Sequence, residues 1–247
     1  MKATIFTLGV FATILATLFT RSQTATADFD PLGEINDLPK LIRVQAEFIE
    51  MPHATYTQLM AKPRTGANDT ALRARCAKLI AAGDAGILET MGVTVLPGYS
   101  ATAESVAEYI YPTEYEPGEI PTKVTGNPQK SLASPPLPTA FDVRNTGSTY
   151  EVEAMIDQNN QFVEVRFAPD LVYHIKNINW GAEKIDGAAG PVEMAHFYSL
   201  SVKTGTTLMT GQPTMVAALS PKDNKGITDP SRKVMVFLRA EVLTVGQ

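Results

Sequence analysis

The fold of this chain is decided by one stretch, Thr139-Ala-Phe-Asp-Val-Arg-Asn-Thr-Gly-Ser-Thr-Tyr-Glu-Val-Glu-Ala-Met-Ile-Asp-Gln-Asn-Asn-Gln-Phe-Val-Glu-Val-Arg-Phe167. Apolar and polar residues alternate in it on both sides of a polar tip at 157–161. The alternating apolar residues are Tyr150, Val152, Ala154, Ile156, Val163, Val165 and Phe167. A period of two with one apolar face is typical of a half-buried antiparallel hairpin, which is what we expect here.

The opposite face of this hairpin is charged. It carries the side chains of Glu151, Glu153, Glu164 and Arg166. We expect this face to be wet, and the sequence leaves two settings open for it. It lines the aqueous lumen of a pore, or it faces the surrounding solvent.

An amphipathic helix is predicted near residues 70–82. Its apolar positions at helical spacing are Leu72, Cys76, Leu79 and Ile80. Asp69 precedes them as the expected N-cap and Gly83 follows as the expected C-cap. The basic residues Arg73, Arg75 and Lys78 are placed on the wet side of this helix.

Further strands are predicted on both sides of the helix. Alternation predicts a strand at 41–51, with a short helical turn at 55–60, and two strands at 85–95 and 101–111 form an expected pair around Pro97-Gly98. Later strands are expected at 171–175, 197–203, 214–219 and 233–242, the last buried on both faces at Met235 and Phe237. The fold class is therefore α+β, mainly antiparallel β.

Prolines cluster between residues 112 and 138. We expect this segment to be a loop or an extended excursion, because proline is excluded from central strands. Tyr111, Glu114, Tyr115 and Glu116 at its start are candidate interface residues, since tyrosine is favoured at protein interfaces. The alternative is that the excursion packs on its own sheet, and the sequence does not decide between the two.

The N-terminus has the pattern of an export signal. Lys2 is followed by an apolar run and by Ala25-Thr-Ala27, which predicts a signal peptide at 1–27. A short lead at 28–40 would precede a β domain at 41–247. We expect an exported protein, located in the periplasm or outer membrane of a Gram-negative-type bacterium.

Charge and cysteine content bear on nucleic-acid binding and on disulfide bonds. Without residues 1–27, which hold Lys2 and Arg21 and no acidic residue, the formal net charge falls from −5 to −7. No basic footprint for nucleic acid is visible. Cys76 is the only cysteine, so we expect no disulfide within the chain, and we interpret Cys76 as a small buried hydrophobe.

The sequence predicts no catalytic residue, cofactor site or metal site. The three histidines, His53, His174 and His196, have no metal-ligand spacing with one another. The sequence contains no G-x-S-x-G, H-E-x-x-H or P-loop motif. We therefore expect that the protein is not an enzyme.

Five segments in order resemble the C-terminal secretin domain of outer-membrane channels of type II and type III secretion and of type IV pili. They are Ile42–Glu50, Ala85–Val95, Val143–Ile156, Thr207–Leu219 with its Gly211-Gln-Pro-Thr214 turn, and Arg232–Val242. The third resembles the family's glycine-containing strand, with Ala154 where proline is usual. The resemblance implies a short form without the family's N-domains.

This resemblance implies a non-enzymatic subunit that assembles with copies of itself, and with other secretion or pilus components, into an outer-membrane channel. Two alternatives stay open: a stand-alone periplasmic β module with no pore, and a secreted α+β enzyme. One departure from the family favours the β module with no pore, because 220–231 is short and polar where the family has an apolar lip.

Overall fold

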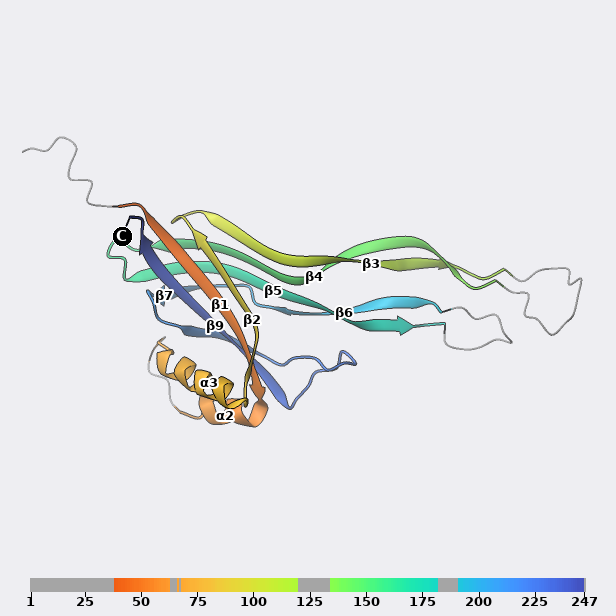
Figure 1. Cartoon of the computed structure of the whole chain (residues 1–247), viewed down its shortest axis with the longest axis horizontal. Helices are drawn as coiled ribbons and strands as arrows, with labels where there is room; N and C mark the ends of the chain where they lie inside the picture. The colour runs from red at the N-terminus through yellow and green to blue at the C-terminus, as the bar shows by residue number, and fades with distance from the viewer. Residues whose placement is uncertain (1–37, 63–65, 67, 120–133, 182–190, 247) are drawn as a thin grey trace, which may run out of the picture. The chain divides into compact units, whose positions relative to one another are not determined.

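The computed structural model describes residues 38–62, 66, 68–119, 134–181 and 191–246 (Figure 1). The predicted signal peptide lies outside these residues. From Pro39 on, the chain belongs to one compact unit. The described elements are β1 (Lys40–Pro52), α2 (His53–Met60), α3 (Thr70–Ala82), β2 (Gly86–Val95), β3 (Ser100–Glu116), β4 (Leu137–Ile156), β5 (Phe162–Asn179), β6 (Glu193–Ser201), β7 (Thr204–Met209), β8 (Thr214–Leu219) and β9 (Arg232–Thr244).

The strands form two antiparallel sheets. The first has the order β2-β1-β9-β8. The second has the order β3-β4-β5-β6, and β7 also pairs with β5. The predicted α+β class with mainly antiparallel strands is confirmed.

The main core lies between the two sheets. Alternate residues of β1 and β9, such as Val44 and Val236, face alternate residues of the hairpin, such as Val152 and Val165. The predicted hairpin is confirmed, with Ile156 opposite Val163 and Val152 opposite Phe167. Its apolar residues are buried or partly buried in this core, which fixes the register because a slip by one residue would turn the charged face inward.

The helices cover the other face of the first sheet. Ile49, Met51, Met235 and Phe237 pack there against Leu72 and Cys76 of α3 and partly buried residues of α2. Figure 1 shows both helices on one side of β1 and β9, with the long strands β3, β4 and β5 on the other. Strand β9 is therefore buried on both faces at its centre, as predicted.

The helix at Thr70–Ala82 is confirmed, with Gly83 in the left-handed conformation at its end. Asp69 occupies the N-cap position, as predicted, and its backbone oxygen accepts the Arg73 N–H at 2.8 Å. Its carboxylate makes no cap hydrogen bond, because Oδ2 accepts the Met215 N–H at 2.8 Å and so holds the start of β8. The wet placement of Arg73 was wrong, because its guanidinium lies half-buried over β1.

The proline-rich excursion is shorter than predicted. Residues 112–116 continue β3, and Leu137 and Pro138 begin β4, with Pro112 opposite Phe141. Strand β3 is at the edge of its sheet, where proline is tolerated because one side of the strand needs no ladder hydrogen bond. Register shifts at 112–115 mark the irregularity. The middle of the excursion, 120–133, lies outside the described residues.

Three other expectations need correction. Strands β2 and β3 do not pair with each other: β2 pairs with β1 and β3 with β4, so the turn at Pro97-Gly98 carries the chain from one sheet to the other. The strand expected at 171–175 is the continuation of β5. The short turn expected at 55–60 is an eight-residue helix, α2.

The second sheet divides along its length. Pairing between β4 and β5 runs from Ile156 opposite Val163 to Gly147 opposite Val172. Beyond that point β4 pairs only with β3, and β5 only with β6. We call 107–116 with 137–146 ribbon 1, and 173–179 with 193–198 ribbon 2. We call the rest of this sheet the base; in it β4 from Gly147 to Ile156 pairs with β5 from Val163 to Val172, with β3 and β7 on the two outer sides.

Candidate functional site

The four charged residues of the hairpin lie together on the exposed face of the base. Glu153 is opposite Arg166, and their side chains form an ion pair at 3.7 Å. Glu151 and Glu164 are exposed on the same face. Because the Glu153–Arg166 pair is in contact with water, it adds little to stability, on the order of 0–1 kcal/mol. The face as a whole is acidic.

This exposed face is hollowed beside β7. Gly205 is opposite Arg166 and has no side chain to cover the sheet. Two adjacent hollows, of about 290 and 360 Å³, are lined by Glu153, Arg166 and Gly205, with threonines of β7 beside them. The two hollows share residues and together follow the acidic face.

The base ends in two strands with free edges. Strand β3 pairs with β4 on one side, and β7 pairs with β5 on one side. Among the described residues no strand covers the outer edge of either. An uncovered strand edge presents backbone N–H and C=O groups to which another strand can pair.

The candidate interface residues separate into two groups. The Tyr111 hydroxyl donates to Asp142 Oδ2 at 3.3 Å, and the Tyr115 hydroxyl donates to the backbone oxygen of Glu193 at 2.7 Å. Both tyrosines are half-buried and make contacts within the chain, whereas Glu114 and Glu116 are exposed on the edge strand. These contacts agree with the alternative prediction, in which the excursion packs on its own sheet. An interface role for the four residues stays a prediction.

An aromatic cluster lies between the two ribbons, and the sequence reasoning missed it. The Tyr109 ring stacks on His174 with centroids 4.2 Å apart. The Phe197 ring contacts both Tyr109 and Tyr111, and the Arg144 guanidinium lies 5.1 Å from its centroid. Aromatic residues at alternate positions, 109 and 111, were a signal in the sequence, but their partners depend on how the ribbons lie.

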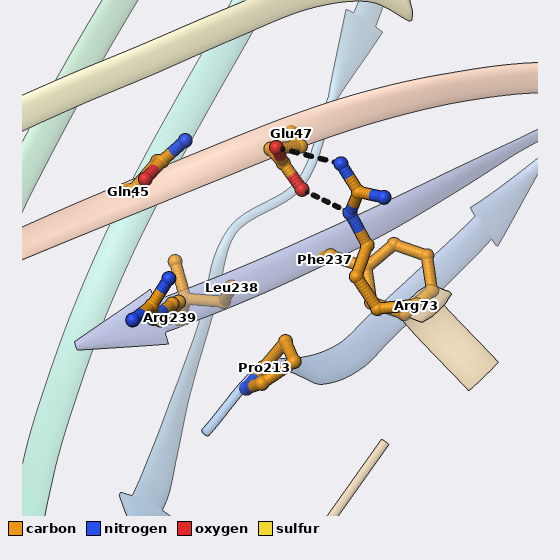
Figure 2. A pocket seen from close by; sticks show the side chains of 7 residues that line it. All are labelled: Gln45, Glu47, Arg73, Pro213, Phe237, Leu238 and Arg239. Atoms are coloured by element: carbon orange, nitrogen blue, oxygen red, sulfur yellow. Dashed lines mark hydrogen bonds and ion pairs between the residues drawn. The ribbon is translucent and has the colours of Figure 1, made fainter. Parts of the chain in front are cut away.

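A separate polar hollow lies beside α3, on the helix side of the first sheet (Figure 2). It measures about 170 Å³ and is lined by Gln45, Glu47, Arg73, Arg239 and three apolar residues. Figure 2 shows Arg73 directed at Glu47, with Nε–Oε2 and Nη2–Oε1 distances of 2.6 and 3.1 Å. This double hydrogen bond raises the pKa of Arg73. With its carboxylate bound in this way, the hollow presents no free base or nucleophile.

The segment at 220–231 lies against β6. The Asp223 carboxylate accepts the N–H groups of Lys225 and Ile227, and the Ile227 bond is the main cause of its lowered pKa. Gly226 lies so close to the His196 ring that a Cβ at this position would be 2.3 Å from it. The segment is therefore a compact polar turn that rests on its own sheet.

No group of three metal-binding side chains is found in the part of the chain that the structure describes. His174 is part of the aromatic cluster, His196 contacts Gly226, and the His53 ring lies 2.8 Å from the Pro230 oxygen. Cys76 is a buried free thiol, as predicted, and burial raises its pKa. Among the described helices none is long and apolar enough to cross a membrane.

Comparisons by sequence find no matching family model and no matching curated protein. Solved structures do match. The type II secretin GspD of enteropathogenic Escherichia coli is 15% identical, with a TM-score of 0.38, over 85% of this chain and 69% of GspD. ExeD of Aeromonas hydrophila is 12% identical, with a TM-score of 0.43, over 99% of this chain and 53% of ExeD.

The type IV competence pilus secretin PilQ of V. cholerae is 8% identical, with a TM-score of 0.38, over 83% of this chain and 59% of PilQ. Solved secretins are thus similar to this chain, as the order of its five segments predicts. The chain spans a little over half the length of ExeD and PilQ. At these low identities the roles of individual residues depend on this chain's own geometry.

Proposed function

We propose that this protein is a non-enzymatic, secretin-like subunit that assembles with copies of itself into a ring, serving as a channel for protein secretion or pilus biogenesis at the outer membrane. The observation that carries the proposal is the pair of free edges on the base, β3 on one side and β7 on the other. Two free edges on opposite sides of one sheet allow head-to-tail pairing, and such pairing closes into a barrel that leaves no edge exposed.

The two edges suit such pairing. Residues at the base of β3, such as Ala101 and Ala103, are opposite the buried Val152 and Tyr150, and β7 has the buried Leu208 opposite Val163. Each edge strand thus has one face toward the core and one toward water. A neighbouring copy that paired in register would continue both faces, and the exposed acidic face would become one surface of the ring. In this proposal Glu151, Glu153, Glu164 and Arg166 line the aqueous lumen.

A disulfide experiment tests the pairing. The double variant Thr102→Cys, Thr207→Cys places thiols on the exposed side of the two edges. Within one copy β4 and β5 separate these positions, so their backbones are at least about 14 Å apart at the usual strand spacing. A disulfide needs Cα atoms within about 7 Å, so any bond that forms joins different copies. Cys76 is buried and is left unchanged.

We expect ladders of covalently joined copies on a non-reducing gel after mild oxidation of the full chain in detergent, and rings in negative-stain images. A second double variant, Glu104→Cys with Thr207→Cys, covers a pairing register shifted by two residues. The matched control, Thr102→Cys with Glu164→Cys, has its second thiol in the middle of the sheet and should give no ladder. Single particles together with no ladder from either double variant would overturn the proposal.

A second function is a periplasmic β module that forms no pore. It is favoured by the compact polar turn at 220–231, which rests on β6 and exposes one large apolar side chain, Ile227, too little for a membrane-crossing lip. This function predicts a protein that stays in solution without detergent and does not release dye from liposomes.

A further inference from the structure

The two ribbons are joined by side chains and not by a backbone ladder. Among the described residues, pairing between β4 and β5 stops at Gly147 and Val172. Past this point each ribbon keeps its own ladder, which runs to Glu116 opposite Leu137 in ribbon 1 and to Asn179 opposite Glu193 in ribbon 2. Each ribbon is thus internally paired, and its hold on the other ribbon depends on a separate set of contacts.

Six residues make most of those contacts, and we call them the clasp: Tyr109, Tyr115, His174, Asn177, Glu193 and Phe197. The Tyr115 hydroxyl donates to the Glu193 oxygen at 2.7 Å and accepts the Glu193 N–H at 3.1 Å. The Tyr109 hydroxyl donates to Asn177 Oδ1 at 3.2 Å, and His174 Nε2 lies 2.9 Å from the same oxygen.

The clasp is a connected network rather than a set of separate contacts. Asn177 also donates from Nδ2 to Glu193 Oε2 at 3.2 Å, so the partners of Tyr109 and Tyr115 are linked on ribbon 2. Phe197 meets Tyr109 edge-on with centroids 5.6 Å apart. Linked hydrogen bonds and ring contacts are lost together, because loss of one member leaves the others with weaker geometry.

The junction between base and ribbons is built on a glycine. Gly147 has φ +118°, and a Cβ there would lie 2.2 Å from the Ser105 oxygen. Pairing of β4 with β3 runs through Gly147 without a register shift, whereas pairing of β4 with β5 stops at this residue. The ribbons beyond it can therefore move apart without breaking a hydrogen bond of the β4–β5 ladder.

We propose that the clasp is a conformational device: the two ribbons part as intact units about the Gly147–Val172 junction, and the clasp sets how often they do so. Parting breaks the side-chain network and exposes the rings of Tyr109 and Phe197, while both ribbon ladders and the base stay formed. A single copy contains every part of this device, so it stands independently of the ring proposed above.

Paired spin labels measure the parting. One pair, on Glu108→Cys and Lys176→Cys, reports the distance between exposed positions of ribbons 1 and 2. A second pair, on Thr102→Cys and Thr207→Cys, reports the distance across the base; its thiols are reduced before labelling, the reductant is removed, and the labelled samples are kept dilute. Each pair is placed in the unmodified clasp, in Tyr109→Phe with Tyr115→Phe, and in those two changes combined with Phe197→Ala.

We expect one narrow inter-ribbon distance in the unmodified clasp. The two tyrosine changes remove only hydroxyl groups, and we expect them to raise the population of longer distances about tenfold, with a further rise on Phe197→Ala. The base distance should stay constant throughout. Tyr99→Phe, which changes an exposed tyrosine in the turn before β3, is the matched control and should alter neither distance.

Three results would overturn the proposal. The first is an unchanged inter-ribbon distance in the triple variant. The second is broadening of the base and ribbon distances together, which would make the clasp part of the global fold. The third is a broad inter-ribbon distance in the unmodified protein that no clasp substitution alters.

Discussion

At the scale of single residues, Gly147 and Tyr150 lie three positions apart in β4, and substitutions at them should change the stability of the protein in opposite directions. Gly147 has a backbone conformation that side chains disfavour. Tyr150 is 1% exposed and its hydroxyl has no hydrogen-bond partner among the described residues. Substitution should therefore destabilise at the first position and stabilise at the second.

Gly147→Ala should destabilise the protein by about 1–3 kcal/mol, the usual cost of a side chain held in a disfavoured backbone region. The added Cβ would also collide with the Ser105 oxygen. Urea unfolding followed by circular dichroism measures the change. Gly92→Ala in β2 is the matched control, since a Cβ there meets nothing within 4 Å. Equal effects of the two substitutions would contradict this account of the junction.

Tyr150→Phe should stabilise the protein by about 1 kcal/mol, because it removes a buried hydroxyl that makes no hydrogen bond. Burial raises the pKa of the Tyr150 phenol. The folded state therefore keeps its proton above pH 10, where the unfolded chain ionises, and stability falls as the pH rises past about 10. Denaturant unfolding between pH 8 and 11 should show a smaller alkaline loss in the variant. Burial also raises the pKa of Tyr198, to about 12, so some loss should remain.

At the scale of elements, β9 carries the heaviest packing. Val234, Val236 and Leu238 face the second sheet, and Met235 and Phe237 face the helices. A strand that is apolar on both faces was visible in the sequence as a run without alternation. It is the layer that both cores share.

Substitution on either face of β9 should therefore unfold the whole molecule. We expect Phe237→Ala to cost about 3–5 kcal/mol, from lost burial and the cavity left behind. Val236→Ala should cost less, because a smaller side chain is removed. Thermal unfolding measures both, and Arg239→Ala, at a half-exposed position of the same strand, is the control. A loss of helix signal with the second sheet still folded would show that the two cores are independent.

Elements whose pattern is local were predicted well from the sequence. The hairpin, the helix at 70–82 and strand β9 all have a period that their own residues display. The start of β4 and the end of β3 were missed because proline there is tolerated only at a sheet edge, which sequence alone does not reveal. The contacts of Arg73 and Tyr109 were missed because each depends on a partner far along the chain, 26 and 68 residues away for Glu47 and Asn177.

At the scale of the whole molecule, the two proposed functions differ in the setting of the acidic face of the base. It lines the lumen in the ring, and it faces the surrounding solvent in the module without a pore. It has three carboxylates against one guanidinium in each copy. In a ring every copy contributes this face, so the potential in the lumen adds up and attracts cations.

If the ring forms and this face lines the lumen, channels in planar bilayers should prefer cations. The combined variant Glu151→Gln, Glu153→Gln and Glu164→Gln should lower that preference, measured as the reversal potential under a salt gradient. Glu114→Gln with Glu116→Gln, which changes exposed carboxylates on ribbon 1, is the control for a general effect of charge. Equal shifts in the two variants would place the acidic face outside the lumen.

Because the second sheet divides into a base and two ribbons, the length of the ribbons is independent of the buried core that stabilises the fold. Residues added to or removed from ribbon 1 or ribbon 2 in facing pairs keep the alternation of each strand and leave the base, where the buried residues lie, untouched. The distance that the ribbons extend can thus vary by about 6.6 Å for every two residues per strand without a new core. Relatives of this protein could differ widely in ribbon length and still share one base.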